Sequence, residues 1–508
     1  MSNREWKTMD DQEFETMLES NLSELPPDDI VRNVTPWKKS MNRVLIGMAL
    51  TTITLEFWYL NYIFPTIGIL LLLLGFRTLK HENKWFGICF IVSIIQAVYV
   101  WGTLILNTTI IQSIVSISDI ISVLKLVVLV LLLIEFICFW RGIVSVQQKA
   151  GVPPHAGVAV ALIVWYAFMC VLAFVQYSGI IIAVAMVVIY VFIIRSLYKL
   201  SKELDEAGYA IHPVPIKVAD RSIVIVLILT LGAGLACGYA FGGSYSMEWT
   251  QLNASEHDDV KEIESHLLSL GFPEYVLGDL STEDIVACEG ALQVVVDITD
   301  EPVNDGRTVI TSEGSGTTYD TVYDVKELRI TGVGVQIPGE RERWIIIHHF
   351  LWSTDPGFYG TESIQLWPPY RLTSEVWCSA GKVTGRVLYD KNGQTYVSDY
   401  DSLGSQTYTS NDILGGDLSS TDVFATFSMP RDSDRQRGYV AYPIDEVQGV
   451  CIISSWFNYT HQRSWLQYPA VTAMETRMTN GWPDAGVFKT IQYALQFDLD
   501  EEHAELIN

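Results

Sequence analysis

The stretch LILTLGAGLACGYAFGGSYS, residues 227–246, lies where the chain changes character. Before it, apolar runs dominate, and after it come acidic segments that are rich in Thr and Trp. The stretch is therefore a cleavable signal, a lipid-attachment site, or the last membrane span of a multi-pass protein. The choice among these three decides on which side of a membrane the second half of the chain lies.

Seven apolar runs in the first half of the chain have lengths that suit membrane-spanning helices, which need about 20 apolar residues and at least about 17. The first two runs are nearly continuous, so they form either one long kinked helix or a tight hairpin that turns around Asn61 and Pro65. The runs occupy residues 44–60, 61–77, 86–106, 119–140, 157–176, 178–195 and 222–242.

The distribution of basic residues distinguishes these two alternatives, because cytoplasmic loops collect Lys and Arg. With seven spans, every basic cluster near a span end falls on one side, whereas the connections around 61, 107–118 and 177 carry no Lys or Arg. With one long helix, the basic cluster at 77–84 would lie outside. The sequence therefore predicts a seven-helix bundle in the plasma membrane, with the N-terminus cytoplasmic and the C-terminus outside.

The opening stretch is then the seventh span. It is a poor lipid-attachment signal, because Gly234 and not Leu lies three residues before Cys237. Cleavage after Ala240 is an alternative, since small residues cluster there, but six spans upstream favour a plain anchor. Gly234, Gly238 and Gly242 recur every four residues on one helix face, a spacing that lets another helix backbone approach closely. This face is the predicted contact with a membrane-protein partner.

Few ionisable residues lie within the predicted spans. Glu56 lies near the outer end of the first span, and Lys125 lies about two turns into the fourth span from the outside. A lone charge at the bilayer centre costs about 3 kcal/mol on insertion scales. Because the two residues lie at similar depth, we expect one structural ion pair between them rather than a proton relay.

The net charge of −25 belongs to the second half of the chain. Residues 1–242 hold 17 acidic and 17 basic side chains, whereas residues 243–508 hold 41 acidic and 16 basic. An acidic surface repels phosphate backbones, so we expect no nucleic-acid partner. The predicted parts are a cytoplasmic acidic segment with an amphipathic helix at 10–22 (1–42), the transmembrane domain (43–242), an extracytoplasmic helical linker (243–290) and an extracytoplasmic β-rich domain (291–508).

Short segments that alternate apolar and polar residues predict strands from Ala291 onward. Asn392-Gly393 between two of them is a strong two-residue hairpin signal. Ten short strands separated by turns predict an antiparallel sandwich or jelly roll, followed by a last helix at 484–497. The predicted strands are 291–299, 307–312, 321–337, 342–352, 363–371, 384–390, 394–400, 421–428, 437–443 and 449–458.

The second half offers few residues for catalysis. His348 and His349 are adjacent, so a strand would point them to opposite faces, and we expect one in the core and one in water. His461 is a third histidine, whose distance from the other two the sequence does not fix. The sequence contains no HExxH, no GxSxG, no P-loop and no GxGxxG followed by a helix. We therefore expect neither a metal nor a cofactor.

Aromatic residues are the more informative feature of the second half. Most of the tryptophans are expected in the core, and any exposed ones would form a stacking surface for sugars or peptides. Cys378 and Cys451 lie in or beside predicted strands, where they either form a disulfide or stay free. The tryptophans of the strand region are Trp344, Trp352, Trp367, Trp377, Trp456, Trp465 and Trp482.

Three classes of function fit these features. In the first, the outer β-domain binds or senses a glycan, a wall component or a peptide, and the membrane bundle couples it to the cytoplasmic segment. In the second, the chain is an accessory or scaffold subunit of a membrane complex. In the third, it is an extracytoplasmic enzyme that uses His348, His349 or His461. The first is favoured, because the loops and aromatic faces of a rigid sandwich commonly serve recognition.

Overall fold

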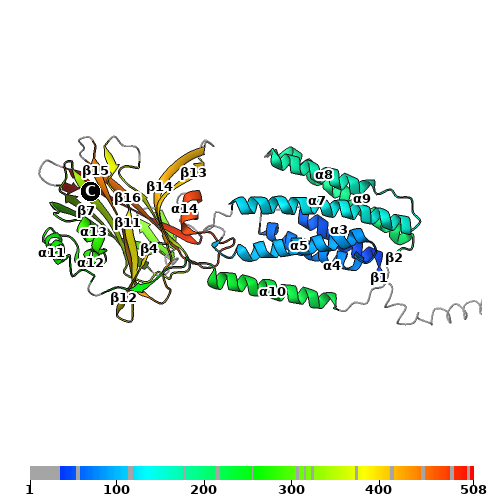
Figure 1. The fold of residues 1–508 in the computed structure, drawn as a ribbon, viewed down its shortest axis with the longest axis horizontal. Coiled ribbons are helices and arrows are strands. Elements are labelled where there is room, and N and C mark those ends of the chain that lie inside the picture. Colours follow the sequence, from blue (N-terminus) through cyan, green and yellow to red (C-terminus); the bar gives the residue numbers. More distant parts are fainter. Residues whose placement is uncertain are drawn as a thin grey trace, which may run out of the picture. The chain divides into compact units, whose positions relative to one another are not determined.

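The computed structural model contains two compact units, Met1–Ile105 with Ile117–Gly234, and Leu106–Ser116 with Leu235–Asn508. The first is built of long helices and the second mainly of strands (Figure 1). The predicted amphipathic helix at 10–22 lies outside the described residues. The structure describes residues 35–52, 58–111, 118–175, 179–211, 218–253, 256–304, 308–313, 316–321, 325–371, 376–411, 417–447, 452–480, 486–499 and 504–507.

Six helices among the described residues are long and apolar enough to cross a membrane, namely Leu60–Leu79, Lys84–Leu106, Leu126–Lys149, Gly157–Phe174, Ile180–Glu206 and Asp220–Phe241. α3 has 16 residues and is shorter than a usual span. The helices of this part of the chain are α3 (Trp37–Thr52), α4 (Leu60–Leu79), α5 (Lys84–Leu106), α7 (Ser118–Lys149), α8 (Gly157–Phe174), α9 (Ile180–Glu206) and α10 (Asp220–Phe241).

α3 and α4 are two helices that pack side by side, and not one continuous kinked helix. Trp58 and Tyr59, in the turn before α4, have positive φ angles of 51° and 59°. The two helices approach so closely that a Cβ on Gly47 would collide with the backbone of Gly68. The turn therefore precedes the expected site, because Pro65 lies inside α4. Proline is more frequent in membrane helices than in soluble ones, so it is a weak sign of a turn here.

Asp220 fixes the start of α10 within the helical unit. Its carboxylate lies 2.8 Å from Arg43 Nη1 of α3 and 2.9 Å from Arg77 Nη1 of α4. A negative charge is also favourable in the first turn of a helix, where Asp220 lies. This contact places the two arginines at the same end of the α3–α4 pair.

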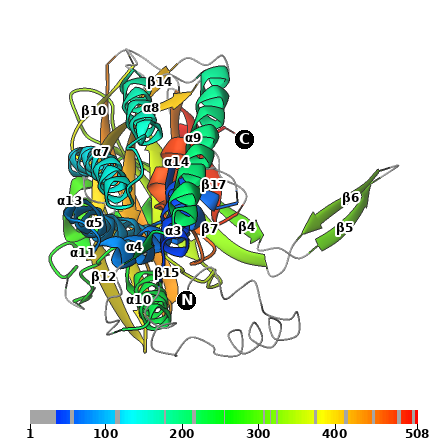
Figure 2. The same ribbon diagram turned by 90° about the vertical axis from the view of Figure 1, so that its right-hand side faces the viewer.

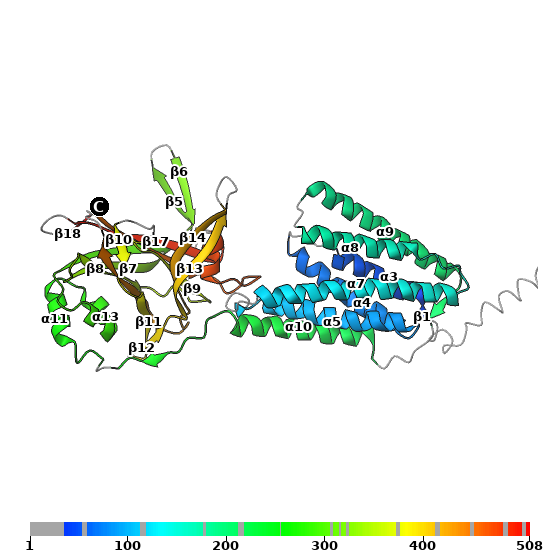
Figure 3. The same ribbon diagram turned by 45° about the horizontal axis from the view of Figure 1, so that its top comes forward.

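The second unit is a sandwich of two antiparallel sheets (Figures 1 and 3). The larger sheet, as far as the structure describes it, has the order β3 (Thr250–Gln251), β12 (Gln394–Asp399), β11 (Thr384–Lys391), β15 (Asp434–Glu446), β8 (Arg343–Trp352), β7 (Val325–Ile337) and β4 (Gln293–Asn304), with β10 (Trp377–Ser379) also paired to β15. The smaller sheet has the order β13 (Ser402–Asn411), β14 (Asp417–Phe427), β9 (Glu362–Trp367), β16 (Ile452–Gln462), β17 (Phe488–Leu499) and β18 (Ala504–Leu506).

Two hairpins show how local sequence directs this unit. Asn392 and Gly393 have φ angles of 54° and 75° and join β11 to β12, so the predicted two-residue hairpin is confirmed. β5 (Thr308–Glu313) and β6 (Gly316–Thr321) pair only with each other among the described residues. Figure 2 shows this second hairpin standing away from both sheets.

Apolar side chains from both sheets form one core between them. Ile346 and Phe350 of β8 meet Ile364 of β9 and Tyr459 of β16, and all four are fully buried. Successive strand residues point to opposite faces, so the other face of β8 needs separate cover. The fold therefore requires a further layer on the larger sheet.

Three short helices supply that layer (Figure 1). They are α11 (Lys261–Ser269), α12 (Glu274–Leu277) and α13 (Thr282–Ala287). Leu267 and Ile285 of these helices share a buried cluster with Val333 and Ile347 of the sheet. These helices are thus part of the β unit and not the separate linker expected for 243–290.

The prediction of a helix at 484–497 is wrong, because this segment forms β17 (Phe488–Leu499). It pairs with β16 from Ile452 opposite Asp498 to Gln462 opposite Phe488. Tyr493, Leu495 and Phe497 are buried at every second position, which is the period of a strand. The last helix is instead α14 (Ala473–Asn480), which lies against the smaller sheet.

Candidate functional site

The three histidines singled out by the sequence lie in three separate buried places. His348 and His349 point to opposite faces of β8, as expected, but both are 0% exposed, so the prediction that one faces water is wrong. His348 Nε2 lies 2.6 Å from Ser455 Oγ between the sheets. His461 Nδ1 lies 3.0 Å from both carboxylate oxygens of Glu362. The structure therefore brings no two of these histidines together.

His349 belongs to a buried ion cluster under the helical layer. Its Nε2 lies 2.9 Å from Asp279 Oδ2, and Arg437 Nε donates to both oxygens of Asp279 at 2.8 and 2.9 Å. Burial alone raises the pKa of Asp279, but the hydrogen bond and charge of His349 and the charge of Arg437 outweigh it, so the pKa is lowered. Asp279 is thus a carboxylate that holds the α12–α13 connection onto the sheet.

Burial lowers the pKa of His348 to about 3, which keeps the ring neutral at ordinary pH. Tyr442 OH lies 2.6 Å from the same Ser455 oxygen. This arrangement resembles a nucleophile beside a base, but all three side chains are sealed in the core. Within the described residues, no group of three or more His, Cys, Asp or Glu could hold a metal ion.

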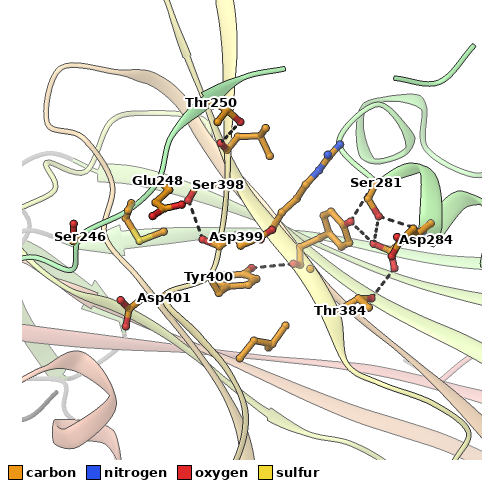
Figure 4. A pocket seen from close by; sticks show the side chains of 17 residues that line it. Ser246, Glu248, Thr250, Ser281, Asp284, Thr384, Ser398, Asp399, Tyr400 and Asp401 are labelled. Atoms are coloured by element: carbon orange, nitrogen blue, oxygen red, sulfur yellow. Dashed lines mark hydrogen bonds between the residues drawn. The ribbon is translucent and has the colours of Figure 1, made fainter. Parts of the chain in front are cut away.

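A cavity of about 740 Å³ opens elsewhere in the β unit (Figure 4). Its walls come from segments that are far apart in the sequence: residues 246–250, the start of α13, β11 with β12, and the start of β13. Tyr439 of β15 also lines it. We call this cavity the acidic pocket, for the carboxylates described below.

Asp284, in the pocket wall formed by α13, is held in place by several hydrogen bonds. Its carboxylate accepts hydrogen bonds from Ser281 Oγ at 2.7 Å, from Thr384 Oγ1 at 2.6 Å and from Tyr439 OH (Figure 4). Ser281 is also the N-cap of α13, because its Oγ accepts the amide of Asp284 at 3.2 Å. Burial and the charge of Asp284 raise the pKa of Tyr439. The phenol therefore stays protonated and donates a hydrogen bond to Asp284.

The rim of the acidic pocket carries four exposed carboxylates. They belong to Glu248, Glu283, Asp399 and Asp401. In the part of the chain that the structure describes, none of the four forms an ion pair. Burial raises the pKa of Asp401.

Arg386 is the single cation in the described pocket lining, and its charge is already matched. Its Nη1 donates to Glu256 Oε1 at 2.6 Å. Its Nε and Nη2 donate to the backbone oxygens of Asp279 and Leu280 at 2.9 and 2.8 Å. With five carboxylates against this one guanidinium, the pocket favours a positively charged ligand.

The sequence did not single out these pocket residues. They come from segments spread over residues 246–439, and only the fold brings them together. The one signal in the sequence is the acidic excess of residues 243–508, which argues against a nucleic-acid partner but gives no location.

Most of the described tryptophans of the strand region are buried or half-buried, and a stacking surface for sugars or peptides stays a prediction. Trp344, Trp352 and Trp377 are buried in the core. Trp367 and Trp456 are half-buried, with ring centroids 6.1 Å apart. Trp465 is the more exposed ring, at 48%, and Trp482 lies outside the described residues.

Gly234 and Gly238 lie in α10, and Gly242 directly follows it. A Cβ on Gly234 would collide with Ile105 of α5, and one on Gly242 would collide with Thr109. Gly238 is buried. These contacts explain close packing within the chain, and contact with another membrane protein stays a prediction.

Two further expectations fall on residues that the structure does not describe. Glu56 and the side chain of Lys125 lie outside the described residues, so their ion pair stays a prediction. Cys378 is a free, exposed cysteine, and Cys451 lies outside the described residues.

Comparisons with known proteins give no family for this chain. No protein-family model and no curated protein matches it. Two solved structures similar to it are a "Pore forming protein" (7% identity, 38% of this chain and 95% of that chain, TM-score 0.16) and "Clostridium perfringens delta-toxin" (10% identity, 41% and 100%, TM-score 0.16). Scores this low support no argument about function. The chain is therefore defined by its own features, a helical unit with six candidate spans followed by a mainly antiparallel β unit.

Proposed function

We propose that this chain is a multi-pass plasma-membrane receptor whose β unit binds a small ligand bearing amino groups, such as an amino sugar or a polyamine, outside the cell. The acidic pocket carries the proposal. Its volume of about 740 Å³ lies within the usual range for small-molecule sites. Its lining of hydroxyls and carboxylates suits ammonium and hydroxyl groups better than an acyl chain.

The proposed topology has seven spans, with residues 1–42 in the cytoplasm and the β unit outside. In it, α3 belongs to the first crossing, so that an odd number of spans separates the termini. Arg43 and Arg77 meet at Asp220, in keeping with basic residues that gather at one membrane face. The bundle then couples ligand binding outside to the acidic segment inside.

The topology predicts opposite labelling of two engineered cysteines in a Cys378→Ser background. A membrane-impermeant maleimide should label Glu289→Cys in intact cells, because Glu289 is exposed on the β unit. It should label His81→Cys, between α4 and α5, only after the cells are permeabilised. Labelling of His81→Cys in intact cells would show that the seven-span model is wrong.

The pocket predicts that its rim carboxylates dominate binding of an amine. Isothermal titration of the full-length protein in detergent would measure the affinity for glucosamine and spermidine. The triple variant Glu248→Gln/Glu283→Gln/Asp399→Asn should bind them about tenfold or more weakly, since each exposed charge contributes up to about 1 kcal/mol. N-acetylglucosamine, whose nitrogen is uncharged, should bind more weakly than glucosamine.

The matched control removes three exposed carboxylates outside the pocket, in the variant Glu289→Gln/Glu340→Gln/Asp434→Asn. Its affinity for both amines should equal that of the unmodified chain. Equal losses in both triple variants would mean that the effect is one of net charge only. Absence of amine binding by the unmodified chain would refute the ligand class.

A further inference from the structure

One end of the helical unit carries three basic side chains that each lie over an aromatic ring. The distances from the cationic atom to the ring centroid are 4.7 Å for Lys80 and Phe90, 5.1 Å for Lys84 and Trp85, and 4.4 Å for Arg141 and Trp140. We call these six residues the basic–aromatic patch. Trp at the end of a span is typical of the membrane–water interface.

The three cations come from neighbouring helix segments, because the start of α5 contacts α7. Asn83 Nδ2, beside Lys84, donates to the backbone oxygen of Gly142 at 3.2 Å, beside Arg141. A Cβ on Gly142 would collide with the Phe86 ring. Lys80 caps the C-terminus of α4 and reaches over α5.

No carboxylate neutralises this patch within the described residues. None of its three cations forms an ion pair there, unlike Arg43 and Arg77 at the start of α10. The acidic side chain between Lys80 and Lys84 is Glu82, which is buried. Glu82 Oε2 accepts the hydroxyl of Tyr209 at 2.6 Å and lies 4.0 Å from Lys149 Nζ. The positive charge of the patch is therefore free to attract an anion.

Exposed apolar side chains continue from the patch along the same helix faces. One turn and two turns beyond Lys84 lie Ile88 and Ile91, which are exposed on α5. One turn and two turns before Arg141 lie Ile137 and Ile134, exposed on α7. An anion with attached acyl chains could contact both the cations and the apolar surface beside them. Free phosphate could contact only the cations.

We propose that the basic–aromatic patch binds the phosphate of an anionic phospholipid headgroup, with the acyl chains along α5 and α7. Lys80, Lys84 and Arg141 hold the phosphate, and the rings of Trp85 and Trp140 lie at the level of the headgroups. Basic sites between membrane helices on the cytoplasmic side commonly bind such headgroups. This site is separate from the acidic pocket and does not depend on its ligand.

Native mass spectrometry of the full-length protein in detergent tests the proposal with phosphatidylglycerol and phosphatidylcholine as probes. The variant Lys80→Gln/Lys84→Gln/Arg141→Gln should bind phosphatidylglycerol more than tenfold more weakly, because each cation near an anionic lipid contributes about a fivefold factor. Its weak binding of phosphatidylcholine should not change. The matched control Arg195→Gln/Lys199→Gln/Lys202→Gln removes three exposed cations of α9 and should keep the affinity.

A charge-preserving variant, Lys80→Arg/Lys84→Arg/Arg141→Lys, keeps the test decisive if the glutamine variant fails to fold. It should bind phosphatidylglycerol within a few-fold of the unmodified chain. Equal loss in the patch and control variants would overturn the proposal, as would no loss in either. Displacement of the lipid by soluble glycerol phosphate at similar concentration would identify a free-phosphate site instead and would also overturn it.

Discussion

Replacement of Asp279 by Asn is expected to lower the free energy of unfolding of the β unit by about 3 kcal/mol. Loss of one partner from a buried ion pair leaves an uncompensated charge and typically costs about 3–5 kcal/mol. Here Arg437 and His349 would lose their shared carboxylate, and both are buried. The lower end of the range applies, because Arg437 Nη1 keeps its hydrogen bond to Asp390 Oδ1 at 3.0 Å.

Hydrogen exchange of the β8 amides in the full-length protein in detergent would measure this loss. The matched control is Asp300→Asn, which breaks an Asp–Arg pair of similar geometry with Arg329 at the surface. An exposed pair contributes about 0–1 kcal/mol, so the control should change little. If Asp279→Asn and Asp300→Asn cost the same, the buried cluster has no special role in stability.

A double variant shows whether the loss of stability comes from the uncompensated charge of Arg437 or from a change in side-chain packing. Arg437→Met in the Asp279→Asn background removes the uncompensated cation, so the double variant should be more stable than the sum of the two single losses predicts. Additive losses would contradict the model of a shared charge cluster. The same variants bear on the acidic pocket, because the connection that Asp279 anchors leads directly to Ser281 in its wall.

The sequence predicted a helical part followed by a mainly β part, and most of the strands, because both depend on local patterns. Long apolar runs give helices, a short apolar run gives β8, and partial alternation gives β16. β13 was missed because the segment SLGSQTYTSN has little apolar alternation and forms a strand by pairing with β14. β17 was read as a helix, although its alternation matches a strand once β16 is beside it.

The candidate site could not be predicted in the same way, because it depends on packing between distant segments. Asp284 and Thr384 are a hundred residues apart, yet their side chains are joined by a 2.6 Å hydrogen bond. The sequence indicates His348, His349 and His461 as candidates by chemical type alone. In the folded chain each of them is buried and has a hydrogen-bond partner from a distant part of the sequence. A local sequence pattern cannot show such a partner.

Acidification is expected to destabilise the β unit well above the pH at which carboxylates become protonated. His348 has a pKa of about 3 in the folded state, because burial disfavours the charged ring, against about 6.5 for an unfolded chain. Since the folded pKa is depressed, the stabilising contribution is complete above about pH 6.5 and is lost as pH falls toward 3. The slope is about 1.4 kcal/mol per pH unit, so about 2 kcal/mol should be lost between pH 7.5 and pH 5.

Pulse proteolysis of the full-length protein in a urea series at pH 5 and pH 7.5 would measure this difference. His348→Gln has no titrating ring, so its difference between the two pH values should be smaller than that of the unmodified chain by about 2 kcal/mol. Because the pKa of Asp279 is lowered, its contribution to the free energy of unfolding varies only below about pH 4. That range lies outside the interval from pH 5 to pH 7.5. A matched control is Ser363→Ala, which changes a buried polar side chain that does not titrate and should leave the pH difference close to that of the unmodified chain. An unchanged pH difference in His348→Gln would mean that the ring of His348 is not held neutral between the two sheets.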